Sequence, residues 1–435
     1  GANVVTFKGN VVSVAGGKTL TIEEPVGGKT GTNLQITANS LDLGPGSNIV
    51  LTGASNNVNF TGATAAVMNV NLNGAGTSDI ILGSAGTYTF GTGTLSFTGD
   101  GALNLRNGSM SATAGAGQSI SIGATVGLNV AEGITLGLTS ATFTNNGAVT
   151  SQGFVVNATS STITNNKSID AGSKAIAITA DNSTFNNTVG SSLTTADANI
   201  DVKSAIGTLA VTNNGGMTIT GATGGNVNIQ SKAGLTVNNT VAGVISTTKG
   251  TLDVNGGTTL SLTNAGSMTA TGNTNLQSNG AMTLNNSGTI STTGSDLNVT
   301  TNNGGNMTVL GGGTLQSATN LTMSVEGAFP GSRTITFDTA GQKLTSGTAS
   351  ITGNTLAFLN GANVQVTVSN PLTLTTDNVT VDNSATGITT NAQYINFVTS
   401  NHFNVNGAGA GVSSFVINTG GTKTVNINPA NADMA

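Results

Sequence analysis

Residues 262–290, LTNAGSMTATGNTNLQSNGAMTLNNSGTI, contain the same short pattern twice, 22 residues apart. In each copy an apolar residue is followed two positions later by Asn, then by Gly, and finally by a second apolar residue. The two copies are Leu262, Asn264, Gly266, Met268 and Leu284, Asn286, Gly288, Ile290. Such a unit predicts a strand, a tight corner and a second strand.

The same pattern continues towards the N-terminus. Its asparagines are Asn145, Asn165, Asn187, Asn213, Asn239, Asn264 and Asn286, with steps of 20, 22, 26, 26, 25 and 22 residues by subtraction. A variable period with a recurring corner is typical of a parallel β-helix, in which corners stack and loops absorb the differences in length. We predict that these seven side chains form a structural hydrogen-bonded ladder. At four corners Gly follows, and we expect it to provide a positive φ: Gly147, Gly215, Gly266 and Gly288.

Alternation of apolar residues with Thr, Ser and Asn extends over most of the chain. Examples are LTIE at 20–23, LSFTG at 95–99 and VQVTV at 364–368, and Gly or Asn usually interrupts the pattern. A period of two indicates strands, and no convincing helical period persists for three turns. We therefore predict an all-β, right-handed parallel β-helix, or β-solenoid. At about 23 residues per coil the chain would make about 19 coils.

The two ends differ in composition from the middle. Residues 1–30 concentrate charge, which predicts an N-terminal strand or cap, since an open coil exposes unpaired backbone. We expect solenoid coils over 31–325, with the Asn corner within 143–290. Residues 326–435 lose this corner and contain most of the late aromatic residues. We expect a distinct C-terminal β region there, or irregular coils and a cap.

Composition excludes several classes of function. Only 7% of the 435 residues are charged, 3% are aromatic, and Cys and Trp are absent. Twelve scattered basic residues and a net charge of -5 do not provide the basic stripe that nucleic-acid binding requires. No apolar run is long enough to predict a membrane-spanning helix. The chain begins at Gly1 with a strand-like segment, 2–7, and we expect a mature, exported protein.

The sequence contains few motifs that would indicate an enzyme. The GGKT strings at 16–19 and 27–30 lack the earlier Gly of a phosphate loop, and we interpret them as turns. His402 is the one histidine, and no nucleophile-elbow string accompanies it. Asp197 and Asp201 are the best candidates for a carboxylate pair of a polysaccharide-active β-helix enzyme. Thr-rich strands also allow an ice-binding face. We expect neither function, and predict no catalytic, cofactor-binding or metal site.

The units at 262–268 and 284–296 resemble the β-helix repeats of filamentous-haemagglutinin-type exoproteins and autotransporter passengers. The resemblance is best over about 143–310. It implies secretion to a bacterial surface and a role in adhesion, aggregation or biofilm formation.

These observations together favour a secreted structural protein of the cell surface without an active site. In the first interpretation the chain assembles with itself, head-to-tail or laterally, into an extracellular filament or surface lattice. A surface with little charge supports this, since little repulsion keeps copies apart. In the alternative, the chain is an adhesin stalk or passenger whose partners are cell-surface glycans or other cells.

Overall fold

The computed structural model describes residues 3–23, 32–54, 56–64, 66–327, 333–381, 384–385, 387–392, 394–399, 404–407, 416–418 and 424–429. Within these residues the chain is all β, without a helix, and forms a parallel β-solenoid. The predicted fold class is therefore confirmed. The chain divides into two compact units: unit 1 contains residues 1–205 and 215–221, and unit 2 contains residues 206–214 and 222–435.

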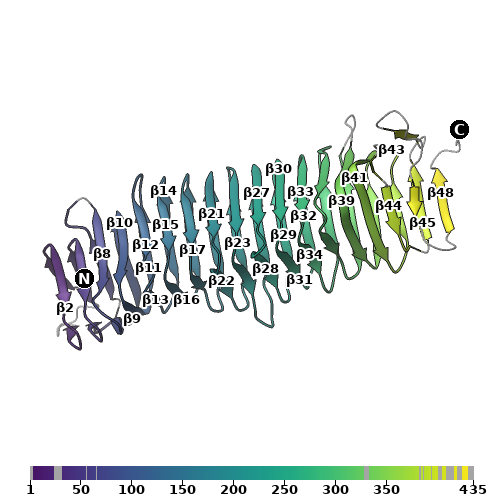
Figure 1. Ribbon diagram of the computed structural model, residues 1–435. Coiled ribbons are helices and arrows are strands. Elements are labelled where there is room, and N and C mark those ends of the chain that lie inside the picture. The colour runs from purple at the N-terminus through teal and green to yellow at the C-terminus, as the bar shows by residue number, and fades with distance from the viewer. Residues whose placement is uncertain are drawn as a thin grey trace. The chain divides into compact units, whose positions relative to one another are not determined.

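In unit 1 each coil contributes strands to three parallel stacks, in which every strand pairs with its counterpart in the next coil (Figure 1). The first stack contains β1 (Asn3–Lys8), β4 (Thr32–Thr37), β7 (Asn57–Thr61), β9 (Thr77–Thr92), β11 (Gly101–Ala114), β14 (Ile134–Thr139), β17 (Phe154–Thr159), β20 (Ile176–Asp181) and β23 (Ile200–Ser204). The second contains β2 (Val11–Val14), β5 (Ser40–Leu43), β8 (Val67–Leu72), β10 (Thr94–Gly99), β12 (Ser119–Ile122), β15 (Thr142–Asn145), β18 (Thr162–Asn165) and β21 (Ser183–Asn187). The third contains β3 (Thr19–Ile22), β6 (Asn48–Leu51), the first halves of β9 and β11, β13 (Val126–Val130), β16 (Ala148–Ser151), β19 (Ser168–Asp170), β22 (Ser192–Thr195) and β25 (Gly216–Ile219).

Unit 2 repeats this arrangement with three stacks of its own. The first contains β26 (Val227–Ser231), β29 (Leu252–Gly256), β32 (Thr274–Ser278), β35 (Leu297–Thr301), β38 (Asn320–Val325), β40 (Thr348–Thr352), β42 (Leu372–Thr375), β45 (Tyr394–Thr399) and β48 (Thr424–Pro429). The second contains β24 (Leu209–Asn213), β27 (Gly234–Asn239), β30 (Thr259–Asn264), β33 (Met282–Asn286), β36 (Met307–Leu310), β39 (Thr334–Ser346), β41 (Thr355–Val368), β43 (Asn378–Val381) and β46 (Asn404–Gly407). The third contains β28 (Val244–Thr247), β31 (Ser267–Ala270), β34 (Thr289–Thr292), β37 (Thr314–Gln316), the second halves of β39 and β41, β44 (Gly387–Thr390) and β47 (Val416–Asn418).

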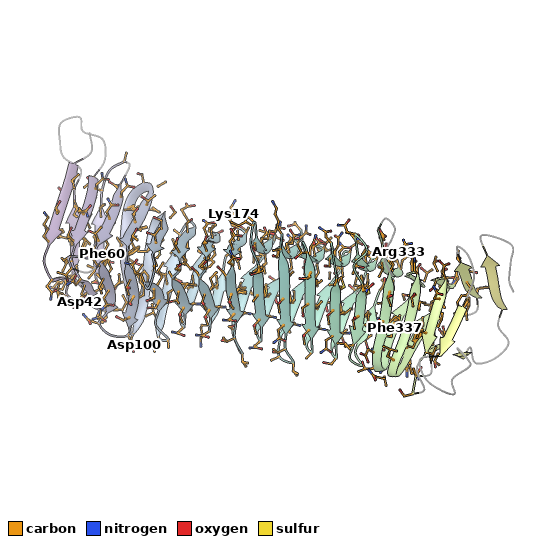
Figure 2. All side chains as sticks on the ribbon, turned by 90° about the horizontal axis from the view of Figure 1, so that it is seen from above. Asp42, Phe60, Asp100, Lys174, Arg333 and Phe337 are labelled. Atoms are coloured by element: carbon orange, nitrogen blue, oxygen red, sulfur yellow. The ribbon has the colours of Figure 1, made fainter. Side chains whose placement is uncertain are left out.

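The interior of each unit is a column of apolar side chains. Successive residues of a strand point to opposite faces, so every second residue of β4 is buried, and Leu34 and Ile36 are completely enclosed. Side chains project from the outer surface of both units, whereas Phe60 in unit 1 and Phe337 in unit 2 lie inside (Figure 2). The alternation read from the sequence is thus an inside-outside alternation.

The length of a coil varies along the chain, and several coils are longer than the expected length of about 23 residues. The step is 29 residues from Asn3 to Thr32, 30 from Asn57 to Thr87 and 30 from Tyr394 to Thr424. The predicted domain boundaries at residues 30 and 325 stay a prediction. Strands β1, β2 and β3 pair in parallel with β4, β5 and β6, and β38 pairs in parallel with β40.

Candidate functional site

The predicted asparagines of unit 1 lie at the ends of β15, β18 and β21. Asn145 Nδ2 donates to Asn165 Oδ1 over 2.8 Å, and Asn165 Nδ2 donates to Asn187 Oδ1 over 2.8 Å. All three side chains are completely buried. Parallel pairing brings them together, because Asn145 is in register with Asn165, and Asn165 with Asn187.

Unit 2 contains the other four predicted asparagines, at the ends of β24, β27, β30 and β33. Nδ2 of one residue donates to Oδ1 of the next, from Asn213 to Asn239 over 2.8 Å, from Asn239 to Asn264 over 2.7 Å and from Asn264 to Asn286 over 2.8 Å. We call this chain of hydrogen bonds the inner ladder of unit 2. Asn213, Asn239 and Asn264 are completely buried and Asn286 is 3% exposed.

The inner ladder also satisfies the carbonyl groups of the corners. Besides Asn286, Asn264 Nδ2 contacts the carbonyl oxygens of Gly266 at 3.4 Å and Thr289 at 3.2 Å. Asn264 Oδ1 accepts from the previous coil. Since buried polar groups are costly unless they are hydrogen-bonded, this arrangement stabilises the coils. Its donors and acceptors are used within the protein, so the ladder is a structural element.

The corner glycines are needed for a different reason from the one expected. The prediction of a positive φ is wrong for Gly147, Gly215, Gly266 and Gly288, none of which has one. A Cβ atom on Gly266 would instead lie 2.2 Å from the carbonyl oxygen of Gly243, and one on Gly288 would lie 2.1 Å from that of Gly266. The backbone of one coil thus approaches the next too closely for any side chain.

The two carboxylates considered for catalysis lie in different surroundings. Asp197 is exposed in a turn, and Asp201 Oδ1 lies 3.0 Å from Lys203 Nζ in an ion pair. Among the described residues there is no group of three or more His, Cys, Asp or Glu side chains arranged to hold a metal ion. His402 lies outside the described residues. The part of the chain that the structure describes likewise contains no helix capable of crossing a membrane.

Two titratable groups among the described residues have shifted pKa values. Burial raises the pKa of Tyr88 in unit 1, whose hydroxyl lies 2.7 Å from the Ile80 carbonyl oxygen and 2.6 Å from that of Arg106. In unit 2, the hydrogen bond from the Thr319 hydroxyl and those from Asn320 hold the pKa of Asp296 below its usual value. Tyr88 lies in the interior, and Asp296 accepts hydrogen bonds from residues of the next coil. We therefore assign a structural role to both side chains.

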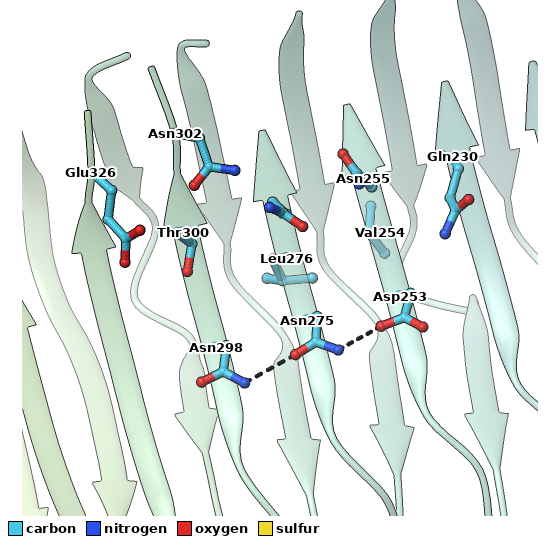
Figure 3. Close-up of a pocket in the computed structure, with 11 residues that line it drawn as sticks. Gln230, Asp253, Val254, Asn255, Asn275, Leu276, Asn298, Thr300, Asn302 and Glu326 are labelled. Carbon is cyan, nitrogen blue, oxygen red and sulfur yellow. Dashed lines mark hydrogen bonds between the residues drawn. The ribbon is translucent and has the colours of Figure 1, made fainter. Parts of the chain in front are cut away.

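A polar groove of about 310 Å³ on the outer surface of unit 2 was not predicted. It crosses β26, β29, β32 and β35 (Figure 3). Along one side, Asn298 Nδ2 donates to Asn275 Oδ1 over 3.0 Å, and Asn275 Nδ2 donates to Asp253 Oδ1 over 2.6 Å. Along the other side lie Gln230, Asn255 and Gln277, which we call the outer amide row.

A signal for the outer amide row exists in the sequence but is weak. Its residues recur at steps of 25 and 22, the same spacing as the coils, and they are in register between neighbouring strands. None of the three follows an apolar residue at two positions, only Asn255 has a glycine two positions later, Gly257, and Asn is too frequent in this chain for spacing alone to distinguish them. The chain matches no protein-family model, no curated protein and no solved structure.

Proposed function

We propose that this chain is a secreted structural protein of the cell surface, of the filamentous-haemagglutinin type, which assembles with itself into an extracellular filament or lattice. The observation that supports the proposal is the incomplete burial of four interior side chains in β1, β2 and β3, although Val14 and Ile22 on the same strands are buried. Val5, Phe7, Val12 and Leu20 occupy inward positions, yet they are only half-buried.

The next coil provides the reference for these four residues. Leu34 and Ile36 are in register with Val5 and Phe7 and are completely buried. Among the described strands, β1, β2 and β3 pair along one edge each, with β4, β5 and β6. A second copy that stacks a coil on this edge would cover the apolar side chains and pair the backbone, and both contributions favour association.

The low charge of the chain supports side-by-side association as well. Outward positions are occupied mainly by Thr, Ser and Asn, and charged residues make up 7% of the sequence. Copies with so few charges repel one another little. Parallel contact between copies therefore needs no specific ion pairs.

The test compares Phe7→Glu with the matched control Thr6→Glu on the same strand. Phe7 points inward and Thr6 outward, so only the first variant places a charge where the next coil would stack. We expect the full-length wild-type chain and Thr6→Glu to form fibres or sheets in negative-stain electron microscopy. Phe7→Glu should remain as separate particles, and thermal unfolding should show that it is still folded. Separate particles of the wild-type chain at all concentrations would contradict the proposal.

The alternative function, an adhesin stalk or passenger, has one observation in its favour. That observation is the polar groove on the outer surface of unit 2, whose amide and carboxylate side chains could accept and donate hydrogen bonds to a glycan. Self-assembly concerns β1, β2 and β3 in unit 1, so the two properties are tested by different variants and one does not require the other.

A further inference from the structure

The three side chains of the outer amide row share a feature that the inner ladder lacks. Gln230 is in register with Asn255, and Asn255 with Gln277, so one amide stands on each of three neighbouring strands. Within the described part of the chain, these amides make no hydrogen bond to protein groups. An amide both donates and accepts, so this row offers regularly repeated hydrogen-bonding groups.

Asn255 at the centre of the row is the strongest indication of a ligand. Its Oδ1 atom is buried and has no hydrogen-bond partner. Native structures contain few such atoms, because a buried acceptor without a donor is destabilising. A hydroxyl donor that enters between Gln230 and Gln277 would satisfy it once the Asn255 side chain turns its amide towards the groove.

The opposite side of the groove determines the charge of a suitable ligand. Asp253 accepts from Asn275 Nδ2 over 2.6 Å and from Thr251 Oγ1 over 3.0 Å, and Glu326 accepts from Ser324 Oγ over 3.3 Å. No cation pairs with Asp253 or Glu326 among the described residues. Unit 1 contains a comparable pair of side chains, in which Asn104 Nδ2 donates to Asp79 Oδ1. There the carboxylate of Asp79 forms an ion pair with Arg106. The groove of unit 2 therefore repels anions and attracts hydroxyl donors.

The direction of the rows determines the shape of the ligand. Both rows cross the strands, so their groups repeat at the strand spacing of about 4.8 Å. A partly open groove of about 310 Å³ that crosses four strands suits a slender polymer better than an enclosed small molecule. The flat face of a second copy would not enter it. A sugar polymer presents hydroxyl groups at a spacing comparable to that of the strands.

We propose that the groove between the outer amide row and Asp253–Asn275–Asn298 binds an uncharged polysaccharide along β26, β29, β32 and β35 (Figure 3). The amides of Gln230, Asn255 and Gln277 donate to and accept from its hydroxyl groups. Asp253 and Glu326 accept hydroxyl hydrogen bonds and exclude acidic polymers.

The experiment is affinity electrophoresis of the full chain, kept below the concentration at which sedimentation detects assembly. The gels contain dextran, galactomannan, mixed-linkage β-glucan or, as the acidic polymer, alginate. We expect at least one neutral polymer to retard the protein and alginate not to. The double variant Asn255→Ala/Gln277→Ala should bind the retarding polymer about tenfold more weakly. The matched control is Gln365→Ala, an exposed amide on β41 outside the groove.

Three results would overturn the proposal. The first is the absence of retardation by every neutral polymer, and the second is equal retardation of the double variant and the wild type. The third is a loss of self-assembly in the double variant, because the groove would then be a contact between copies. Thermal unfolding of each variant shows that the fold is intact, and Phe7→Glu should keep full polysaccharide binding.

Discussion

The inner ladder and the outer amide row of unit 2 are built from the same chemical group at the same coil spacing. In the inner ladder, Asn239 Nδ2 donates to Asn264 Oδ1 over 2.7 Å, and both side chains are completely buried. In the outer amide row, Asn255 has neighbours in register on both sides, yet its Oδ1 atom has no partner. The difference shows that regular stacking of amides does not by itself produce a ladder. Side-chain direction and the corner that surrounds the amide decide it.

The largest effect is expected for a charge inside the inner ladder. Asn264→Asp removes the Nδ2 donor of the bonds to Asn286 and Thr289 and buries a carboxylate against acceptor oxygens. We expect the free energy of unfolding of unit 2 to fall by about 3 kcal/mol or more at neutral pH. Gln277→Glu in the outer amide row is the control and should change it by less than about 1 kcal/mol, because the Gln277 side chain is only half-buried. Denaturant unfolding followed by circular dichroism measures both, and equal losses would refute the distinction between the two rows.

The next largest effect concerns the corner that accompanies each ladder asparagine. A Cβ atom on Gly215 would lie 2.3 Å from the Ser191 carbonyl oxygen, whereas one on Gly216 would have its nearest neighbour at 3.6 Å. Neither glycine has a positive φ. Gly215→Ala should therefore lower the free energy of unfolding by about 1–3 kcal/mol, and Gly216→Ala should be nearly neutral. Equal melting temperatures of the two variants would contradict the close approach of the coils.

A smaller effect should follow from removal of the unpaired amide itself. Asn255→Leu deletes a side chain that makes no hydrogen bond with its Oδ1 atom. We expect unchanged or slightly increased stability, within about 1 kcal/mol, because no partner group is left unsatisfied. Asn239→Leu provides the contrast. It removes the Oδ1 acceptor of Asn213 Nδ2 and the Nδ2 donor to Asn264 Oδ1. Thermal unfolding of the two variants compares the rows directly, and a strong loss in Asn255→Leu would show that its amide is structural.

The smallest effect is a dependence on pH. The inner ladder contains only amides and does not titrate, whereas Asp296 accepts hydrogen bonds from Thr319 and Asn320 that hold its pKa below the usual value of 3.8. Its stabilising contribution is fully present above this value and is lost as the pH falls through the lower pKa of the folded state. The stability difference between the wild type and Asp296→Asn should therefore shrink below about pH 4. A difference that stays constant down to pH 2 would assign the stabilisation to something other than the carboxylate.

The sequence predicted the inner ladder well because two independent signals coincide there. Asn264 and Asn286 each follow an apolar residue at two positions and precede a corner glycine at two positions. The coil period then joins these local patterns into one stack. In the outer amide row no residue follows an apolar residue at two positions, and only Asn255 precedes a glycine at two positions, Gly257, so the local pattern is incomplete. A chain so rich in Asn and Thr offers many sets of residues with that spacing.

The reason for the corner glycines was beyond local sequence reasoning. Gly266 occurs where a turn is expected, and a turn often requires a positive φ. The actual requirement is the 2.2 Å that would separate a Cβ atom on Gly266 from the Gly243 carbonyl oxygen in the neighbouring coil. A contact of this kind depends on the distance between coils, which the residues around Gly266 do not encode.

The sequence by itself determined that this protein is a parallel β-solenoid with asparagines stacked at its corners. The alternation of apolar and polar residues predicts the strands and the side chains that they bury. A repeat of about 20–26 residues predicts that each strand pairs with its counterpart in the next coil. Only the tertiary structure decided which amides form hydrogen bonds within the protein and which lie on the outer side of the strands without a partner. That outcome depends on the register between coils and on the direction of each side chain, and both are set by the complete stack rather than by any single repeat.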